Sequence, residues 1–207
     1  KGLMLAKMRN GGAACTAANR VYVQRPIAAE FTKKFSAAMS AFVMGRGRDA
    51  GIQLGASVSI NERNKIAELV DESVASGGKV IVGGTLPDGP GAFYPATVIE
   101  VASDNPILNH EVFGPVAPVV TFDTDEEAIT LANGTDYGLI SYVYSEDLKR
   151  ALRMAEAIES GMVAINRGVI SDPAAPFGGV KQSGLGREGG FDGIHEFLET
   201  KYIGVEI

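Results

Sequence analysis

Apolar residues along the chain recur in two rhythms, one typical of helices and one typical of strands. After Pro26 the apolar side chains come every three or four residues, at Ile27, Phe31, Phe35, Met39 and Phe42. This spacing predicts a helix with one apolar face, and Pro26 suits its first turn, where a missing N–H costs nothing. We expect that face to pack in the core.

A second helix is predicted after Ser59, which stands in capping-box spacing with Glu62. The apolar stripe that follows consists of Ile66, Leu69, Val70 and Val74. Gly77-Gly78 is expected to end the helix. Residues 1–8 are typical of the end of another helix, and residues 123–133 of a short one closed by Gly134.

A further helix is predicted after residue 145. Ser145 is expected to cap it, and Glu146 and Asp147 would then lie in the first turn, where acidic side chains complement the helix dipole. The side chains expected to face inward are Leu148, Ala151, Leu152 and Ala155. Gly161 would end the segment.

Six short apolar runs predict strands: 20–24, 79–82, 94–101, 116–122, 139–144 and 162–165. Strands that alternate with amphipathic helices predict an α/β fold with a mostly parallel sheet flanked by helices. Neither an internal repeat nor a linker divides the chain. We therefore expect one domain over residues 1–198, followed by a separate strand over 199–207.

The tail, 197–207, alternates apolar and polar residues, as a strand does. A strand at a terminus either closes the sheet of its own chain or pairs with the edge of another subunit. The pattern alone leaves both possibilities open.

Composition narrows the class of protein. The 207 residues are 45% hydrophobic and 21% charged, as in ordinary globular proteins, and the net charge of −6 gives no reason to expect nucleic acid or an anionic membrane as a partner. We find neither a membrane-spanning apolar run nor a signal-peptide pattern. One cysteine excludes an internal disulfide and favours a reducing cytoplasm. A start at Lys1 suggests a piece of a longer chain.

Cys15, the only cysteine, lies in a stretch of small residues after Gly11-Gly12 and before the predicted strand 20–24. Such a turn leaves little side-chain bulk to block a substrate, and a thiolate is a strong nucleophile. A buried structural cysteine is the alternative.

Three motifs together carry a family resemblance. The first is R-N-x-G-x-x-C with A-N-R-x-Y-V-Q within Met8–Gln24, the second is E-V-F-G-P at 111–115, and the third is P-F-G-G-V-K at 176–181 leading into S-G-L-G-R-E at 183–188. In this order the motifs resemble the aldehyde dehydrogenase superfamily over essentially the whole chain. The resemblance implies the catalytic-domain fold of that family, with the N-terminal cofactor-binding domain absent.

The resemblance implies the chemistry of Cys15. Its sulfur would attack an aldehyde carbonyl to give a thiohemiacetal, hydride would pass to a nicotinamide ring, and water would hydrolyse the remaining thioester. The Cys15 N–H would be one oxyanion donor. The second donor in the family, an asparagine, and the glutamate base belong upstream of Lys1.

Glu111 and Phe113 are the residues that the resemblance assigns to the cofactor. Glu111 would accept hydrogen bonds from the nicotinamide ribose, and Phe113 would pack beside the nicotinamide. A solvated turn and a core position are their respective alternatives. The cofactor would be NAD or NADP, because the site that distinguishes them is not in this chain. We reject a dinucleotide role for the G-x-G-x-x-G at 184–189, since it lacks a leading strand and a βαβ unit.

Arg9 and Ser171 resemble the residues with which succinate-semialdehyde dehydrogenases bind the far carboxylate of the substrate, and Phe177 would line the substrate pocket. An arginine and a hydroxyl suit a carboxylate. A surface charge is the alternative for Arg9. Ala17 stands where some relatives carry a second cysteine, so a thiol switch of that kind is not expected. His110 and His195 are too far apart to suggest a metal motif.

The resemblance also implies a homo-oligomer, a dimer or tetramer, in which the C-terminal strand adds to the sheet of a neighbour. Two rival interpretations remain. One is a relative that reduces an acyl phosphate by the same cysteine chemistry, and the other is a non-catalytic oligomerisation module.

Overall fold

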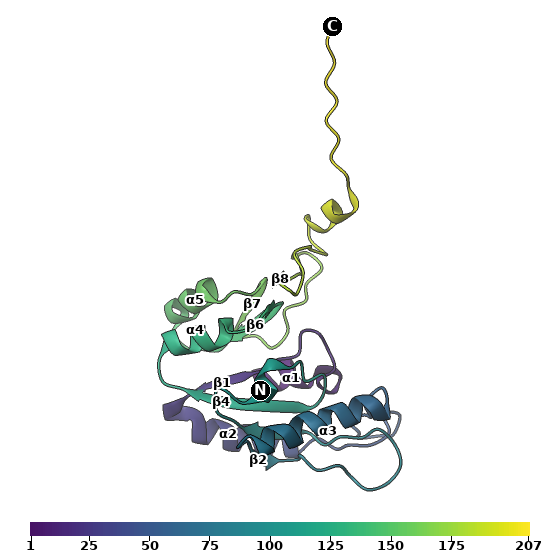
Figure 1. Ribbon diagram of the computed structural model, residues 1–207, viewed down its shortest axis with the longest axis vertical. Coiled ribbons are helices and arrows are strands. Elements are labelled where there is room, and N and C mark those ends of the chain that lie inside the picture. The colour runs from purple at the N-terminus through teal and green to yellow at the C-terminus, as the bar shows by residue number, and fades with distance from the viewer.

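The chain folds into helices and short strands that alternate along the sequence (Figure 1), and the computed structural model describes residues 1–207. The α-helices are α1 Gly2–Met8, α2 Arg25–Ser40, α3 Ile60–Ala75, α4 Asp125–Asn133 and α5 Leu148–Ala157. The strands are β1 Val21–Gln24, β2 Lys79–Val82, β3 Thr97–Glu100, β4 Val116–Phe122, β5 Tyr137–Gly138, β6 Ile140–Val143, β7 Met162–Ile165 and β8 Val180–Lys181. Short 3₁₀ helices span η1 Arg9–Gly12, η2 Pro106–Asn109 and η3 Gly193–Phe197.

The largest sheet has the strand order β1-β4-β3-β2. Strands β1 and β3 run parallel to β4, and β2 is antiparallel to β3. A parallel pair, β6 and β7, and an antiparallel pair, β5 and β8, form two further sheets. The predicted α/β fold with a mainly parallel sheet is therefore confirmed, but the strands are divided among three sheets.

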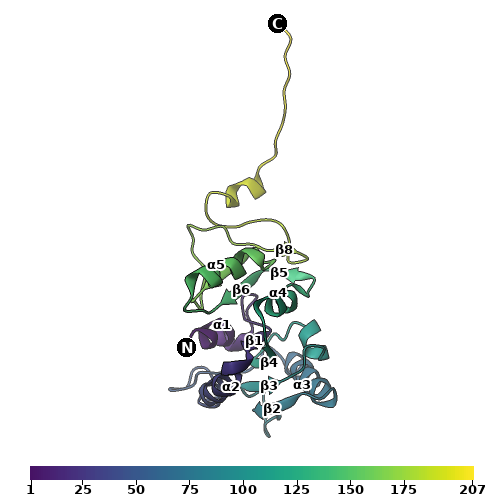
Figure 2. The ribbon, with the colours of Figure 1, turned by 90° about the vertical axis from the view of Figure 1, so that its left-hand side faces the viewer.

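Helices cover both faces of the four-stranded sheet, with α2 on one side and α3 on the other (Figure 2). Alternate strand residues point to opposite faces, so each face has its own core. Val98 packs with Phe35 and Met39 of α2, whereas the next residue, Ile99, packs with Ile66 and Val70 of α3. Both predicted helical stripes thus pack in the core, and only their outermost members, such as Ile27 and Val74, are exposed.

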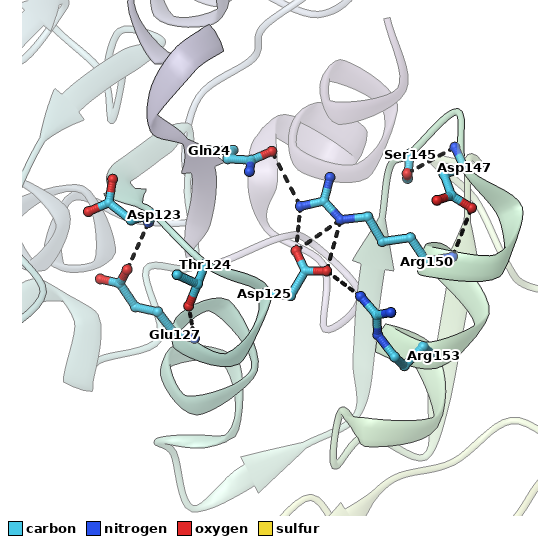
Figure 3. Close-up of polar contacts among 9 residues, drawn as sticks. All are labelled: Gln24, Asp123, Thr124, Asp125, Glu127, Ser145, Asp147, Arg150 and Arg153. Carbon is cyan, nitrogen blue, oxygen red and sulfur yellow. Dashed lines mark hydrogen bonds and ion pairs between the residues drawn. The ribbon is translucent and has the colours of Figure 1, made fainter.

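Asp125 at the start of α4 links helix α5, which connects β6 and β7, to the end of β1 in the four-stranded sheet (Figure 3). Its carboxylate accepts hydrogen bonds from the guanidinium groups of Arg150 and Arg153. Arg150 also donates to the side chain of Gln24 at the end of β1, at 3.3 Å. The arginines hold the pKa of Asp125 below its ordinary value, chiefly through the hydrogen bond from Arg150. This cluster ties both parts of the chain together.

The prediction for α5 was wrong about its start, its end and part of its inner face. Asp147, not Ser145, is the N-cap, because its carboxylate accepts the N–H of Arg150 at 3.0 Å. Glu146 and Asp147 therefore precede the first turn, and the helix ends at Ala157, before Gly161. Ala151 is fully buried as expected, but Leu148 and Leu152 are 62% and 49% exposed. Arg150 and Arg153 of the helix form ion pairs with Asp125 at the start of α4.

The strand predicted over 94–101 is shorter than expected and covers only Thr97–Glu100. Pro95 lies within the predicted range and has no N–H to donate to a ladder. Its carbonyl instead accepts the Thr97 hydroxyl at 2.8 Å. Tyr94 is still buried, so this segment belongs to the core without being a strand.

The tail after η3 extends away from the rest of the molecule, as Figures 1 and 2 both show. Residues 199–207 pair with no strand of their own chain and are exposed. The structure thus forms no strand over 199–207, and pairing with another subunit stays a prediction. None of the helices is long and apolar enough to cross a membrane.

Candidate active site

Cys15 lies on a tight turn that follows the end of α1. Helix α1 stops at Met8, and Asn10, Gly11 and Gly12 then take positive φ angles of 51°, 62° and 80°. The N–H of Ala17 donates to the carbonyl of Ala14 at 2.8 Å, which closes a turn around Cys15. The side chain of Cys15 is exposed, so the buried-cysteine alternative is wrong.

The backbone N–H of Cys15 donates to no other group of the chain. An N–H beside a nucleophilic sulfur can stabilise an oxyanion that forms on the attacked carbon. The turn therefore presents a sulfur and an unused donor on the same residue.

The turn is supported from behind. Thr16 is buried, and its carbonyl accepts the hydroxyl of Tyr142 in β6 at 2.8 Å. Burial raises the pKa of Tyr142 and Tyr144 adds to this, whereas the hydrogen bond to Thr16 lowers it.

The E-V-F-G-P loop lies directly against the cysteine turn. Gly12 packs on the backbone of Gly114, where a Cβ atom on Gly12 would come within 2.1 Å of the carbonyl oxygen. In this loop Val112 is buried, whereas Glu111 is exposed and Phe113 is 46% exposed. The loop thus presents the two residues that were assigned to the cofactor to the outside, as a ligand lying across it requires.

Asn19 and Lys7 hold this loop from the side of the cysteine segment. The Asn19 side chain donates to the carbonyl of His110 at 2.6 Å and accepts the N–H of Val112 at 2.7 Å. Lys7 in α1 is fully buried, and its Nζ lies 3.5 Å from the carbonyl oxygen of Val112. Burial lowers the pKa of Lys7 to about 7, while the charge of Glu111 opposes this shift.

The structure brings the segments that carry the predicted substrate residues, Arg9 and Ser171, to the same helix, α1. Arg9 at the end of α1 is exposed, and its guanidinium makes no hydrogen bond or ion pair within the chain. Gly168 packs on α1, since a Cβ there would lie 2.4 Å from the carbonyl oxygen of Gly2, and this brings the segment before Ser171 to the same helix. No hydrogen bond joins Arg9 to Ser171.

Phe177 is half-buried and exchanges two backbone hydrogen bonds with Glu188, of 2.7 and 2.9 Å. None of its hydrogen bonds reaches the cysteine turn. The G-x-G-x-x-G at 184–189 follows the two-residue strand β8 and precedes only a 3₁₀ helix. It is therefore not part of a βαβ unit, which is the context that a dinucleotide fingerprint needs.

Sequence reasoning missed Asn19, Lys7 and Tyr142. For Asn19 and Lys7 a signal existed: Asn19 lies within the first motif, and Lys7 is a charge between the apolar residues Ala6 and Met8. Tyr142 carried no such signal, because it is one aromatic residue in an ordinary strand pattern.

Comparisons with known proteins agree with this arrangement. The sequence pattern of the aldehyde dehydrogenase family matches residues 1–203. A succinate-semialdehyde dehydrogenase of Paenarthrobacter nicotinovorans is 55% identical over 99% of this chain and 46% of its own length. A 3-sulfolactaldehyde dehydrogenase of Pseudomonas putida is 43% identical over 98% of this chain and 42% of its own length.

A solved structure gives the same result. The crystal structure of PnpE, from Pseudomonas sp. WBC-3, in complex with nicotinamide adenine dinucleotide superposes with a TM-score of 0.92 at 39% identity, covering 96% of this chain and 42% of that one. The chain thus spans less than half the length of the relatives it matches. Over nearly all of its residues it belongs to the aldehyde dehydrogenase family.

Proposed function

We propose that this chain is the catalytic portion of an NAD(P)-dependent aldehyde dehydrogenase that oxidises succinate semialdehyde or a closely similar aldehyde with an anionic end. The observation that carries the proposal is Cys15, the only cysteine, exposed on a turn that is packed against the loop of Glu111. Family membership supports an oxidoreductase, and the 55% identical relative supports the substrate.

In the proposed reaction the sulfur of Cys15 attacks the aldehyde carbon, and the carbonyl oxygen takes the negative charge. The unused N–H of Cys15 then donates to that oxyanion. A bound nicotinamide cofactor would supply the acceptor for the hydride that leaves this carbon. Cys15 is left as a thioester, and water attacks it to release the carboxylic acid, the Cys15 thiolate and a proton.

Glu111 and Phe113 are the residues of this chain that we assign to the cofactor. A carboxylate accepts two hydrogen bonds at once and so suits a ribose diol. The exposed Phe113 ring offers a flat apolar surface two residues later. Both NAD and NADP carry this ribose, so these residues do not distinguish the two.

Arg9 and Ser171 are our candidates for the far end of the substrate, and Phe177 for the wall of the pocket. Succinate semialdehyde and 3-sulfolactaldehyde, which the names of two relatives specify, both end in an anionic group. The exposed and unpaired guanidinium of Arg9 suits such a group, because arginine can offer it two parallel N–H donors.

We further propose that the protein acts in the cytoplasm as a homo-oligomer, a dimer or tetramer. The extended tail over residues 199–207 has unpaired backbone groups, which supports its addition to the sheet of a second subunit. Neither nucleic acid nor a membrane is a proposed partner.

The test of this function is the Cys15→Ala variant of the full-length enzyme. We expect it to lose aldehyde oxidation with succinate semialdehyde while its thermal unfolding stays nearly unchanged, because the side chain is exposed. In this 207-residue chain, the rate of labelling by iodoacetamide at neutral pH measures the reactivity of Cys15, since the chain has no other cysteine. Substantial cofactor reduction by the variant would refute the assignment.

A further inference from the structure

The carboxamide of Asn19 bonds to the peptide groups on both sides of Glu111. Its Nδ2 donates to the carbonyl of His110 at 2.6 Å, and its Oδ1 accepts the N–H of Val112 at 2.7 Å. The backbone on each side of Glu111 is therefore held by a single side chain. With both neighbours held, the direction in which the Glu111 carboxylate leaves the loop is held as well.

Only an amide of this length satisfies both partners. A carbonyl needs a donor and an N–H needs an acceptor, and the asparagine side chain carries one of each. This requirement also fixes which end of the amide faces which partner. Aspartate would keep the acceptor for Val112 but place a carboxylate oxygen against the carbonyl of His110.

Asn19 is itself held by its neighbours in the chain. The N–H of Ala18 donates to the carbonyl of Ala6 at 2.9 Å. The guanidinium of Arg20 donates to the carbonyls of Leu131 and Ala132 at 3.4 and 3.2 Å. Because residues on both sides are anchored, Asn19 is a fixed support and not a side chain that follows the loop.

Asn19 also lies on the segment that bears the nucleophile, four residues after Cys15. Lys7, eight residues before Cys15, donates to the carbonyl of Val112 from the other side over the longer distance of 3.5 Å. The Glu111 loop is thus attached to the chain both before and after Cys15.

From this geometry we infer that Asn19 is a positioning residue for the cofactor: it aims the Glu111 carboxylate and fixes it relative to Cys15. The inference rests on the proposed function, in which Glu111 binds the nicotinamide ribose. In this role Asn19 acts only through its bonds to His110 and Val112. Its loss should therefore weaken cofactor binding and leave the nucleophile in place.

The experiment compares Asn19→Ala with the unchanged full-length enzyme, using whichever of NAD and NADP it prefers. We expect the KM for the cofactor to rise about tenfold, which corresponds to a loss of about 1.4 kcal/mol, while kcat changes much less. Alkylation of Cys15 by iodoacetamide, measured without cofactor, should keep its rate within about twofold. If Asn19 had a purely structural role, its loss would change the cofactor KM and the rate of Cys15 alkylation together.

Asn133 offers a matched control elsewhere in the fold. Its side chain donates to the carbonyl of Ala157 and accepts the N–H of Glu159, both at 2.9 Å, so it brackets one residue in the same way. Asn133→Ala therefore removes the same two kinds of hydrogen bond away from the cysteine turn. Its cofactor KM should stay unchanged, and an equal rise in both variants would overturn the inference.

A second variant and a double-variant comparison complete the test. Asn19→Asp keeps the acceptor for Val112 but sets a carboxylate oxygen against the carbonyl of His110, so it should raise the KM at least as much as Asn19→Ala, and it carries the test if the alanine variant does not fold. If Asn19 acts through Glu111, Asn19→Ala adds nothing to the KM of Glu111→Ala. If the effects of Asn19→Ala and Glu111→Ala on the KM are fully additive, the inference is wrong but the proposed function stands. If Glu111→Ala leaves the KM unchanged, the proposed ribose contact is wrong and the inference falls with it.

Discussion

Gly12 lies against the carbonyl of Gly114, at a distance that leaves no space for a side chain. A Cβ on Gly12 would be 2.1 Å from that oxygen, and the φ angle of Gly12 is +80°. The residue three positions before Cys15 and the glycine of the E-V-F-G-P loop are thus in direct backbone contact. This contact joins two motifs that lie about a hundred residues apart in the sequence.

We therefore expect Gly12→Ala to destabilise the fold by about 2–5 kcal/mol, the sum of left-handed backbone strain and overpacking. Urea unfolding of the 207-residue chain measures this loss. Gly51→Ala is the matched control, because Gly51 has nearly the same φ of +82° but nothing within 4 Å of its Cβ position. The control should show the strain alone, about 1–2 kcal/mol. Equal losses in the two variants would mean that the contact with Gly114 is not tight.

Lys7 should make the stability of the chain depend on pH. Its pKa is lowered by burial from 10.5 to about 7 in the folded state, so the unfolded state binds the proton more tightly. Above pH 10.5 Lys7 is neutral in both states, and the free energy of unfolding is at its full value with respect to this residue. As the pH falls from 10.5 toward about 7, the unfolded state takes up the proton first and the free energy of unfolding decreases. The slope is at most about 1.4 kcal/mol per pH unit.

We expect Lys7→Met to remove this slope and to be more stable than the unchanged chain at pH 7. Chemical unfolding at pH 7, 8 and 9 gives the comparison, with the exposed Lys33→Met on α2 as the control. A plot of the free energy of unfolding against pH should have the same slope for the control as for the unchanged chain. If Lys7→Met also has this slope, Lys7 does not change its charge between the folded and unfolded states in this range.

Local patterns predicted most of what is local in this structure. The apolar stripes placed α2 and α3, the capping spacing of Ser59 and Glu62 placed the start of α3, and small residues around Cys15 placed its turn. Each of these features depends on residues a few positions apart, which is the range that periodicity and capping report.

Features that depend on distant partners were not predicted. The bonds of Asn19 and Lys7 to the Glu111 loop join residues 91 to 105 positions apart, and nothing in either segment names its partner. The contact of Arg150 in α5 with Asp125 likewise joins residues 25 positions apart. Helical spacing identified an amphipathic helix there but not that Leu148 and Leu152 would be exposed.

Substrate choice is tested by Arg9→Ala in the full-length enzyme. A charge-assisted hydrogen bond contributes about 1.5–3 kcal/mol, so kcat/KM for succinate semialdehyde should fall about 10- to 150-fold. For an uncharged aldehyde of similar length, kcat/KM should fall little. Arg46→Ala, another exposed arginine without a partner, should leave both substrates unaffected. If Arg9→Ala lowers kcat/KM equally for both aldehydes, Arg9 supports structure and does not bind the carboxylate.

The 207-residue chain on its own should fold but should not oxidise aldehydes. Folding is expected because the four-stranded sheet has a core on each face, both built entirely from this chain. For catalysis the chain offers a nucleophile, Glu111 and Phe113. Its βαβ unit, β6-α5-β7, has no glycine in the turn at 144–147 and so lacks the glycine-rich turn that holds a dinucleotide pyrophosphate. Hydride transfer needs reacting atoms about 3–3.5 Å apart, and a misplacement of 1 Å can cost about a hundredfold.

One carboxylate and one ring cannot hold a dinucleotide with that accuracy. The purified chain should therefore unfold cooperatively, react with iodoacetamide at Cys15, and form no NADH or NADPH with succinate semialdehyde. The full-length enzyme, assayed in parallel, supplies the rate against which the chain is judged, and Cys15→Ala in the chain supplies the background. Cofactor reduction by the chain near the full-length rate would show that these 207 residues hold the cofactor unaided.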